Sequence, residues 1–268
     1  MKILILGDVM GSSGRKAVKN NLSKLIKDET IDFTVINGEN AADDGKGITK
    51  SISDEFFQLG VDVITSGNHI YDKKETNDYI DQENRLLRPA NFVETSPGKG
   101  FGIYPTKDKR FTVGVINLMG NVFMKKTDDV FVTAKKIKNK IRLKDNADFI
   151  VIDFHGEITS EKMAIGHFFD GLSTGVVGTH THVPTADTRI LEKGTAYQTD
   201  IGMCGDYNSV IGMNKENSIK KFFKDKSATN HFPAEGEASL SGIIIEADHK
   251  TGLANKVTRV IEGGTLRK

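Results

Sequence analysis

The stretch KILILGDVMG, from Lys2 to Gly11, decides the fold of this chain. Four consecutive apolar residues, Ile3 to Leu6, are followed at once by Gly7 and Asp8. A short apolar run that ends at a turn residue is typical of a buried strand, and it is far too short for the hydrophobic segment of a signal peptide. In open α/β sheets, ligands bind beyond the carboxyl ends of the strands. The polar residues that follow such runs are therefore the first candidates for a functional site.

Similar runs recur along the chain and alternate with helical patterns, which predicts an α/β protein. Further strands are expected at Phe33–Asn37, Asp62–Ser66, Phe111–Asn117, Phe149–Phe154 and Gly175–Gly178. Helices are predicted at Gly14–Lys27, Ile52–Leu59 and Asp129–Leu143. Towards the C-terminus, strands separated by turns are predicted at Arg189–Leu191, Thr195–Thr199, Gly242–Glu246 and Lys256–Ile261, and they imply a second sheet. We expect two packed sheets covered by helices, in a single domain over residues 1–268.

Composition limits the classes of function. The chain has 37 Lys and Arg residues against 36 Asp and Glu residues, so its net charge of +1 offers no broad positive field for long nucleic acid or an anionic membrane. The single cysteine, Cys204, cannot form an intrachain disulfide or a Cys-rich metal site, which favours a reducing cytoplasm. The uncharged stretches fall short of a bilayer span. We therefore expect a cytoplasmic protein with no membrane segment and a small ligand.

Five of the predicted strand ends carry polar side chains of related chemistry. These side chains are oxygen donors and imidazoles: Asp8, Glu39, Asn40, Asn68, His69, His155, His180 and His182. Such ligands suit Mn, Fe or Zn better than a metal selected by thiolates. Residues two apart share a face in an extended segment, so His180 and His182 could enter one site. Taken singly, each residue fits a turn, a helix cap or a hydrogen-bonded core histidine, but together they favour a metal site.

The segment GSSGR, from Gly11 to Arg15, has two interpretations. It could be an anion-binding helix N-terminus or simply a capped loop that uses the conformational freedom of glycine. The sequence favours neither interpretation. The segment lacks the Walker lysine and the GxGxxG spacing, which disfavours nucleotide-triphosphate and dinucleotide folds.

Taken in order, Asp8, Glu39–Asn40, Gly67–His69, His155 and His180–His182 resemble the motifs of the calcineurin-like metallophosphoesterases, and more narrowly those of the bacterial YmdB-like subfamily. The similarity covers most of the chain and includes GDVMGSSGR, NGENAADDGKGIT, SGNHIYDKKE, FHGEITSEK and DGLSTGVVGTHTHVPTAD. The wider superfamily usually has a histidine where this chain has Met10, and an aspartate motif in place of Glu39–Asn40. The subfamily shares the replacement of that aspartate motif, so the departure changes the ligands without removing the site.

The resemblance implies a four-layer α/β/β/α sandwich of two mixed sheets flanked by helices, with two divalent transition metal ions per chain. One ion would be held by Asp8, Glu39, Asn40 and His182, and the other by Glu39, Asn68, His155 and His180, with Glu39 bridging both. Iron or manganese is expected, with zinc or magnesium as alternatives. His69 is left free in this scheme to act as the catalytic proton donor. The resemblance also implies a homo-oligomer, either a dimer or a tetramer.

The activity implied by the resemblance is phosphodiester hydrolysis, with 2′,3′-cyclic nucleotides as characteristic substrates and short RNA ends as a further class. Two cations about 3.5–4 Å apart can activate a bridging hydroxide and stabilise an in-line displacement. A general acid at the leaving ribose oxygen should add about 10²–10⁴ in rate, and His69 fits that role. Two alternatives remain open: a phosphomonoesterase or 5′-nucleotidase, and a regulatory protein that binds a nucleotide or RNA and retains the site. His69 argues against the second alternative, because a pure binder needs no acid.

Overall fold

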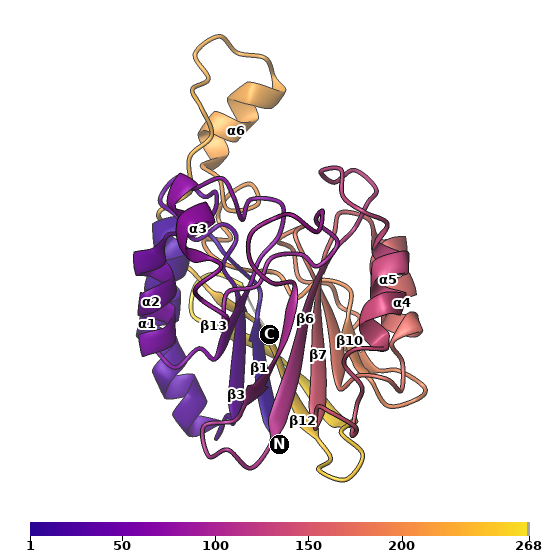
Figure 1. The fold of residues 1–268 in the computed structure, drawn as a ribbon. Coiled ribbons are helices and arrows are strands. Elements are labelled where there is room, and N and C mark those ends of the chain that lie inside the picture. The colour runs from indigo at the N-terminus through magenta and orange to yellow at the C-terminus, as the bar shows by residue number, and fades with distance from the viewer. Residues whose placement is uncertain (267–268) are drawn as a thin grey trace.

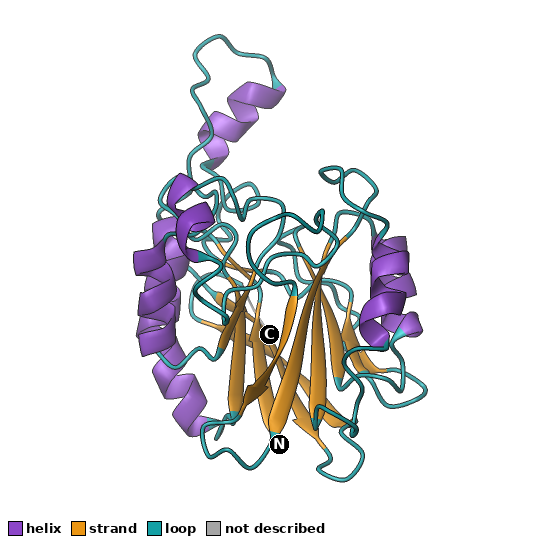
Figure 2. Ribbon diagram, viewed as in Figure 1, coloured by secondary structure: helices purple, strands orange, loops and turns teal. Residues whose placement is uncertain are grey.

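Two mixed β-sheets stack face to face in the computed structural model, which describes residues 1–266 (Figures 1 and 2). The first sheet consists, in spatial order, of β13 (Ala254–Glu262), β12 (Leu240–Ala247), β1 (Lys2–Leu6), β3 (Phe33–Asn37) and β4 (Val63–Thr65). The second consists of β5 (Phe101–Pro105), β6 (Thr112–Met119), β7 (Phe149–His155), β8 (Gly175–Thr179), β10 (Ala196–Gln198) and β9 (Arg189–Ile190). A short parallel pair joins β2 (Asp8–Val9) to β11 (Met203–Cys204).

Helices cover the outer side of each sheet (Figure 2). On one side lie α1 (Gly11–Asp28), α2 (Lys50–Gln58) and α3 (Lys74–Tyr79), and on the other lie α4 (Val130–Lys138) and α5 (Thr159–Phe168). The remaining helix, α6 (Lys215–Phe222), belongs to an arm that protrudes at the top of Figure 1. Three helix starts are fixed by side chains, since Thr49, Asp129 and Asn214 accept hydrogen bonds from the N–H groups of Ile52, Val132 and Asn217.

The apolar residues of β1 explain the layering. Ile3 and Ile5 belong to the core between the two sheets, whereas Leu4 and Leu6 belong to the core beneath α1 and α2. A third apolar layer separates the second sheet from α4 and α5. A strand buried on both faces needs an unbroken apolar run, which is what β1 has. The predicted α/β/β/α sandwich of two mixed sheets is thus confirmed.

The composition of the second sheet differs from the prediction. The C-terminal strands β12 and β13 were expected in it, but they join the first sheet, where β12 pairs antiparallel with β1. The edge strand of the second sheet is β5, which was not predicted. The helices α3, α5 and α6 were not predicted either. The predicted helix Asp129–Leu143 ends at Lys138, because Asn139 forms its C-cap and the chain then turns. The single domain over residues 1–268 stays a prediction.

The carboxyl ends of the parallel strands from both sheets meet at one end of the sandwich. Asn37 and Thr65, which end β3 and β4, both donate hydrogen bonds to Asp153 of β7, at 2.9 and 2.5 Å. This junction brings the loops that follow the strands of both sheets to one place. Within residues 1–266, no helix combines the length and apolar character that a membrane crossing requires.

Candidate metal centre

Each predicted ligand lies at or just after a strand of the sandwich. Asp8 begins β2 directly after β1, and His155 is the last residue of β7. The others lie in the loops after β3, β4 and β8: Glu39, Asn40, Asn68, His180 and His182. The predicted placement of these residues at strand ends is therefore confirmed.

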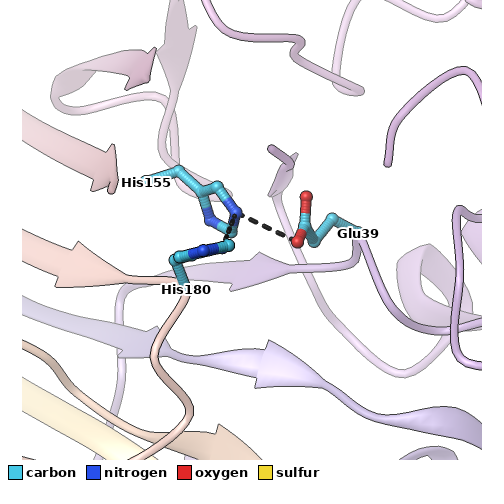
Figure 3. A group of neighbouring side chains, drawn as sticks. All are labelled: Glu39, His155 and His180. Carbon is cyan, nitrogen blue, oxygen red and sulfur yellow. Dashed lines mark hydrogen bonds and ion pairs between the residues drawn. The ribbon is translucent and has the colours of Figure 1, made fainter. Parts of the chain in front are cut away.

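Three polar atoms converge on Nε2 of His155, and Figure 3 shows the two side chains Glu39 and His180 that provide two of them. Glu39 Oε1 lies at 3.0 Å, His180 Nδ1 at 3.0 Å and Asn68 Oδ1 at 3.2 Å. One imidazole nitrogen carries at most one proton, so it cannot satisfy three lone pairs at once. The candidate ligand atoms of Glu39, His155 and His180 all lie within 4.8 Å of one another, so this group could hold a metal ion.

The remaining candidates adjoin this group. Asp8 is fully buried, and its Oδ2 accepts a hydrogen bond from the His180 N–H at 3.0 Å, while its Oδ1 has no hydrogen-bond partner among residues 1–266. His182 donates from Nδ1 to the Ile211 carbonyl, which leaves Nε2 facing Asn40 Oδ1 at 3.3 Å. A buried carboxylate oxygen without a partner is costly, and a cation would satisfy it. The donor set therefore fits a metal site.

Burial and neighbouring charges split the pKa values of the two carboxylates. Burial raises the pKa of Asp8 to about 6, against the opposing effect of His182 and His155. Burial acts on Glu39 in the same direction, but the His155 imidazolium and its hydrogen bond lower the pKa of Glu39 to about 2. Glu39 is therefore ionised at every physiological pH, as a metal ligand would need to be.

The pKa values of His155 and His180 are also shifted in opposite directions. Burial alone would lower the pKa of His155, but Glu39 and Asp8 raise it to about 9. Burial and the neighbouring His155 lower the pKa of His180 to about 3. His180 is thus neutral, with a lone pair to offer, and His155 carries the proton that a metal ion would replace.

His69 lines a cavity beside this group and is hydrogen-bonded to a residue outside it, Asp72. Its Nδ1 lies 2.6 Å from Asp72 Oδ2, so Nε2 is its remaining ring nitrogen. The cavity has a volume of about 280 Å³, and its lining includes Glu39, His69, His180 and His182. An imidazole anchored at one nitrogen and facing the cavity can hold a proton at the other. This arrangement is suited to proton transfer at the cavity.

Four residues with clear roles at the centre were not predicted from the sequence. Asp72 anchors His69, Glu157 lies 3.1 Å from His180 Nε2, and Thr179 and Asp153 support His155. Asp153 had a readable signal, because an ionisable residue inside the apolar strand FIVIDFH needs a buried partner. Glu157 stands in the FHGE segment at a strand end, next to a predicted ligand. Asp72 and Thr179 had no signal beyond their nearness to ligands in sequence.

Asp153 fixes the orientation of His155 through Thr179. The His155 Nδ1–H donates to Thr179 Oγ1 at 2.9 Å, and the Thr179 hydroxyl donates to Asp153 Oδ1 at 2.7 Å. Burial raises the pKa of Asp153, and the hydrogen bonds from Thr65, Thr179 and Asn37 oppose that rise. Such a chain selects the tautomer that leaves Nε2 for the metal side.

Two packed mixed sheets with this centre at their shared end define a metallophosphoesterase-like protein. The chain belongs to the family of YmdB-like proteins, which matches residues 4–260. It is 47% identical, over 97% of both chains, to the Bacillus subtilis (strain 168) protein named 2′,3′-cyclic-nucleotide 2′-phosphodiesterase. The crystal structure of a novel phosphatase from Mycoplasma pneumoniae superimposes with a TM-score of 0.88 at 35% identity, over 98% of this chain and 94% of that one. A hypothetical protein from Thermus thermophilus gives a TM-score of 0.89 at 33% identity, over 99% and 100% of the two chains.

Proposed function

We propose that this protein is a metal-dependent phosphodiesterase that hydrolyses 2′,3′-cyclic nucleotides. The observation that carries the proposal is the convergence of Glu39, His155 and His180 on one point beside the cavity. The name of the Bacillus subtilis relative, at 47% identity, supports the substrate class. The near-neutral charge of the chain favours a small substrate over long RNA.

Two divalent transition metal ions, iron or manganese, would occupy the centre. The first would be held by Asp8, Glu39, Asn40 and His182, and the second by Glu39, Asn68, His155 and His180. When bound, the ions would supply an activated water and positive charge for the phosphate oxygens. Elemental analysis of protein loaded with Mn²⁺ is expected to give two ions per chain, and only trace metal after loading would contradict this site.

The reaction also needs a proton for the leaving oxygen, and a side chain of this protein would supply it. Attack at phosphorus breaks the bond to one ribose oxygen, and that oxygen must take up a proton as it leaves. We assign this proton to His69 Nε2, because Asp72 anchors the other ring nitrogen at 2.6 Å. Asp72 Oδ1 also accepts a hydrogen bond from Lys125 Nζ at 3.3 Å, which helps to hold the carboxylate in place.

A hydrolysis panel tests the proposal. Chelated protein supplied with Mn²⁺ is expected to hydrolyse 2′,3′-cyclic AMP and GMP faster than 3′,5′-cyclic AMP, and also faster than AMP or p-nitrophenyl phosphate. The Mycoplasma pneumoniae relative of known structure is described as a phosphatase, so a monoesterase is the second candidate. A monoester that is the best substrate by a wide margin would establish that second candidate instead. Light scattering of the same protein tests the proposed dimer or tetramer.

A further inference from the structure

The segment Thr179–His182, which carries two of the proposed ligands, has an unusual backbone. His180 has φ of +100° and His182 has φ of +67°. Residues other than glycine adopt such values at a cost in free energy, so the surrounding structure must hold them there. Thr181, which lies between the two proposed ligands, is one residue through which the structure can hold this segment.

Thr181 is fixed by one buried carboxylate. Asp200 Oδ2 accepts a hydrogen bond from the Thr181 N–H at 3.1 Å and another from the Thr181 hydroxyl at 2.7 Å. Threonine and histidine alternate in this segment, so Thr179 contacts Asp153 while Thr181 contacts Asp200. The threonine side chains bind the protein interior, and the histidine side chains face the proposed metal ions.

Asp200 is itself held from two further directions. Lys162 Nζ, from α5, lies 2.6 Å from Asp200 Oδ2, and both residues are only 1% exposed. The other oxygen, Oδ1, accepts a hydrogen bond from the Gly202 N–H at 2.8 Å. A buried ion pair is weak support for stability, because apolar residues of similar size can replace it without loss. Its directional hydrogen bonds to Thr181 point to a role at the site.

We propose that Asp200, backed by Lys162, is a positioning residue that fixes Thr181 and thereby sets His180 and His182 in the geometry that binds metal. Asp200 would not touch the metal or the substrate. The inference rests on the proposed metal site, and it adds a requirement that neither the ligand list nor the fold implies.

Thr181 offers the cleanest test, because neither a valine nor a serine at this half-buried position should prevent folding. Thr181→Val removes the hydroxyl that Asp200 binds, and Thr181→Ser keeps it. Isothermal titration of the chelated proteins with Mn²⁺ is expected to show an affinity about 10–100-fold lower for the valine variant, as is typical when an outer hydrogen-bond partner is lost. The serine variant should stay within about threefold of the unchanged protein. Equal affinities for all three proteins, or equal losses in both variants, would overturn the proposal.

Asp200→Asn tests the carboxylate directly, with Asp170→Asn as its matched control. Asp170 is also buried, and it accepts hydrogen bonds from the Lys193 and Thr195 N–H groups without contacting the histidine segment. Both substitutions should lower the melting temperature of the chelated protein, but only Asp200→Asn should also weaken Mn²⁺ binding. Loss of thermal stability alone in both variants would show that Asp200 is merely structural. If Asp200→Asn does not fold, the Thr181 variants decide the matter.

Failure of this inference is distinguishable from failure of the proposed function. Unchanged protein that binds no Mn²⁺ would refute the metal site itself. The other outcome is that unchanged protein binds Mn²⁺ and hydrolyses 2′,3′-cyclic AMP, while the Thr181→Val variant has the same Mn²⁺ affinity. That outcome would refute only the positioning role of Asp200.

Discussion

Asn68 and His69 are neighbours in sequence, but their side chains point to different partners. Asn68 Oδ1 faces His155 Nε2 at 3.2 Å, whereas the His69 ring is bound by Asp72. The backbone N–H of His69 donates to Glu39 Oε2 at 3.1 Å, which ties this loop to the proposed bridging ligand. The pair therefore separates a proposed neutral ligand, Asn68, from a side chain that could donate a proton, His69.

We expect His69→Ala to keep both metal ions and to lower turnover of 2′,3′-cyclic AMP by about 10²–10⁴. The reason is that the leaving ribose oxygen loses its proton donor while the ligands stay in place. The loss should shrink for a p-nitrophenyl phosphodiester, whose leaving group needs no proton. Metal analysis and turnover of both substrates measure these effects. Loss of metal, or an equal loss on both substrates, would assign His69 to metal or phosphate binding instead.

Glu39→Gln is expected to be the most damaging conservative substitution at the centre. Glutamine keeps the shape of Glu39 but removes the negative charge that both proposed ions would share. Mn²⁺ affinity should fall by more than the roughly 10–100-fold that loss of an outer partner costs. Glu157→Gln is the comparison, since Glu157 is exposed and its carboxylate lies 3.1 Å from Nε2 of one proposed ligand, His180. Calorimetric titration with Mn²⁺ measures both, and equal losses would remove Glu39 from the bridging position.

At the scale of the elements, most of the strands were predictable, and one helix shows why three of the helices were not. The apolar run Phe33–Asn37 has the same bounds in sequence and structure. Helix α5 has Gly166 near its end and an exposed Met163, so its helical pattern is weak. Glycine is required there because a Cβ would lie 2.4 Å from Cε2 of Tyr197. Tertiary packing therefore determines the residue type at position 166, and a local sequence pattern does not reveal it.

The loop after β4 depends on glycine for a related reason. A Cβ on Gly67 would lie 2.2 Å from His155 Cδ2 and 2.3 Å from Glu39 Oε2. We expect Gly67→Ala to displace these two side chains and to abolish most Mn²⁺ binding. Gly114→Ala is the control, because its Cβ would meet Ile141 in the apolar core at 2.8 Å, away from the centre. Both variants should lose thermal stability, and a Gly67→Ala variant with normal Mn²⁺ affinity would contradict the geometry of the centre.

At the scale of the whole molecule, the residues of the proposed metal centre were predictable and the side chains that support them were not. Asp8 and His155 can be picked out from the sequence because each is a polar residue at the end of an apolar run. The partners of Asp153 come from other strands, since Asn37 lies 116 residues away in sequence and Thr65 lies 88. Pairing over such separations is decided by which sheet faces which. The position of β12 beside β1 escaped prediction because this pairing, within one sheet, also joins residues far apart in the sequence.

The pKa values of the centre link the stability of the chelated protein to pH. Folding raises the pKa of His155 from 6.5 to about 9, so its contribution is complete below pH 6.5 and is lost as the pH rises through 9. Glu39, with a folded pKa of about 2, loses its contribution only in acid. Asp8, whose pKa is raised to about 6, loses its contribution as the pH rises through 6, in the same direction as His155. Burial raises the pKa of Cys204 to about 12, and its ionisation in the unfolded chain matters only above about pH 8.5. His180 acts in the opposite direction, because its folded pKa of about 3 lies below 6.5, so it adds stability as the pH rises through 6.5. That gain is complete soon above pH 6.5, whereas the loss from His155 continues towards pH 9, so His155 dominates up to pH 8.5.

We therefore expect the melting temperature of the chelated protein to fall by roughly 5 °C between pH 6.5 and 8.5, since one extra proton held by the folded state is worth about 1.4 kcal/mol per pH unit. Mn²⁺ must replace this proton, so its affinity should rise over the same range and the stabilisation it gives should increase. Thermal melts with chelator and with Mn²⁺ measure both trends. Glu39→Gln removes the charge that raises the pKa of His155, so the chelated variant should have a flatter profile. A chelated protein whose melting temperature stays constant or rises over this range would show that His155 is not the proton-bearing group of the centre.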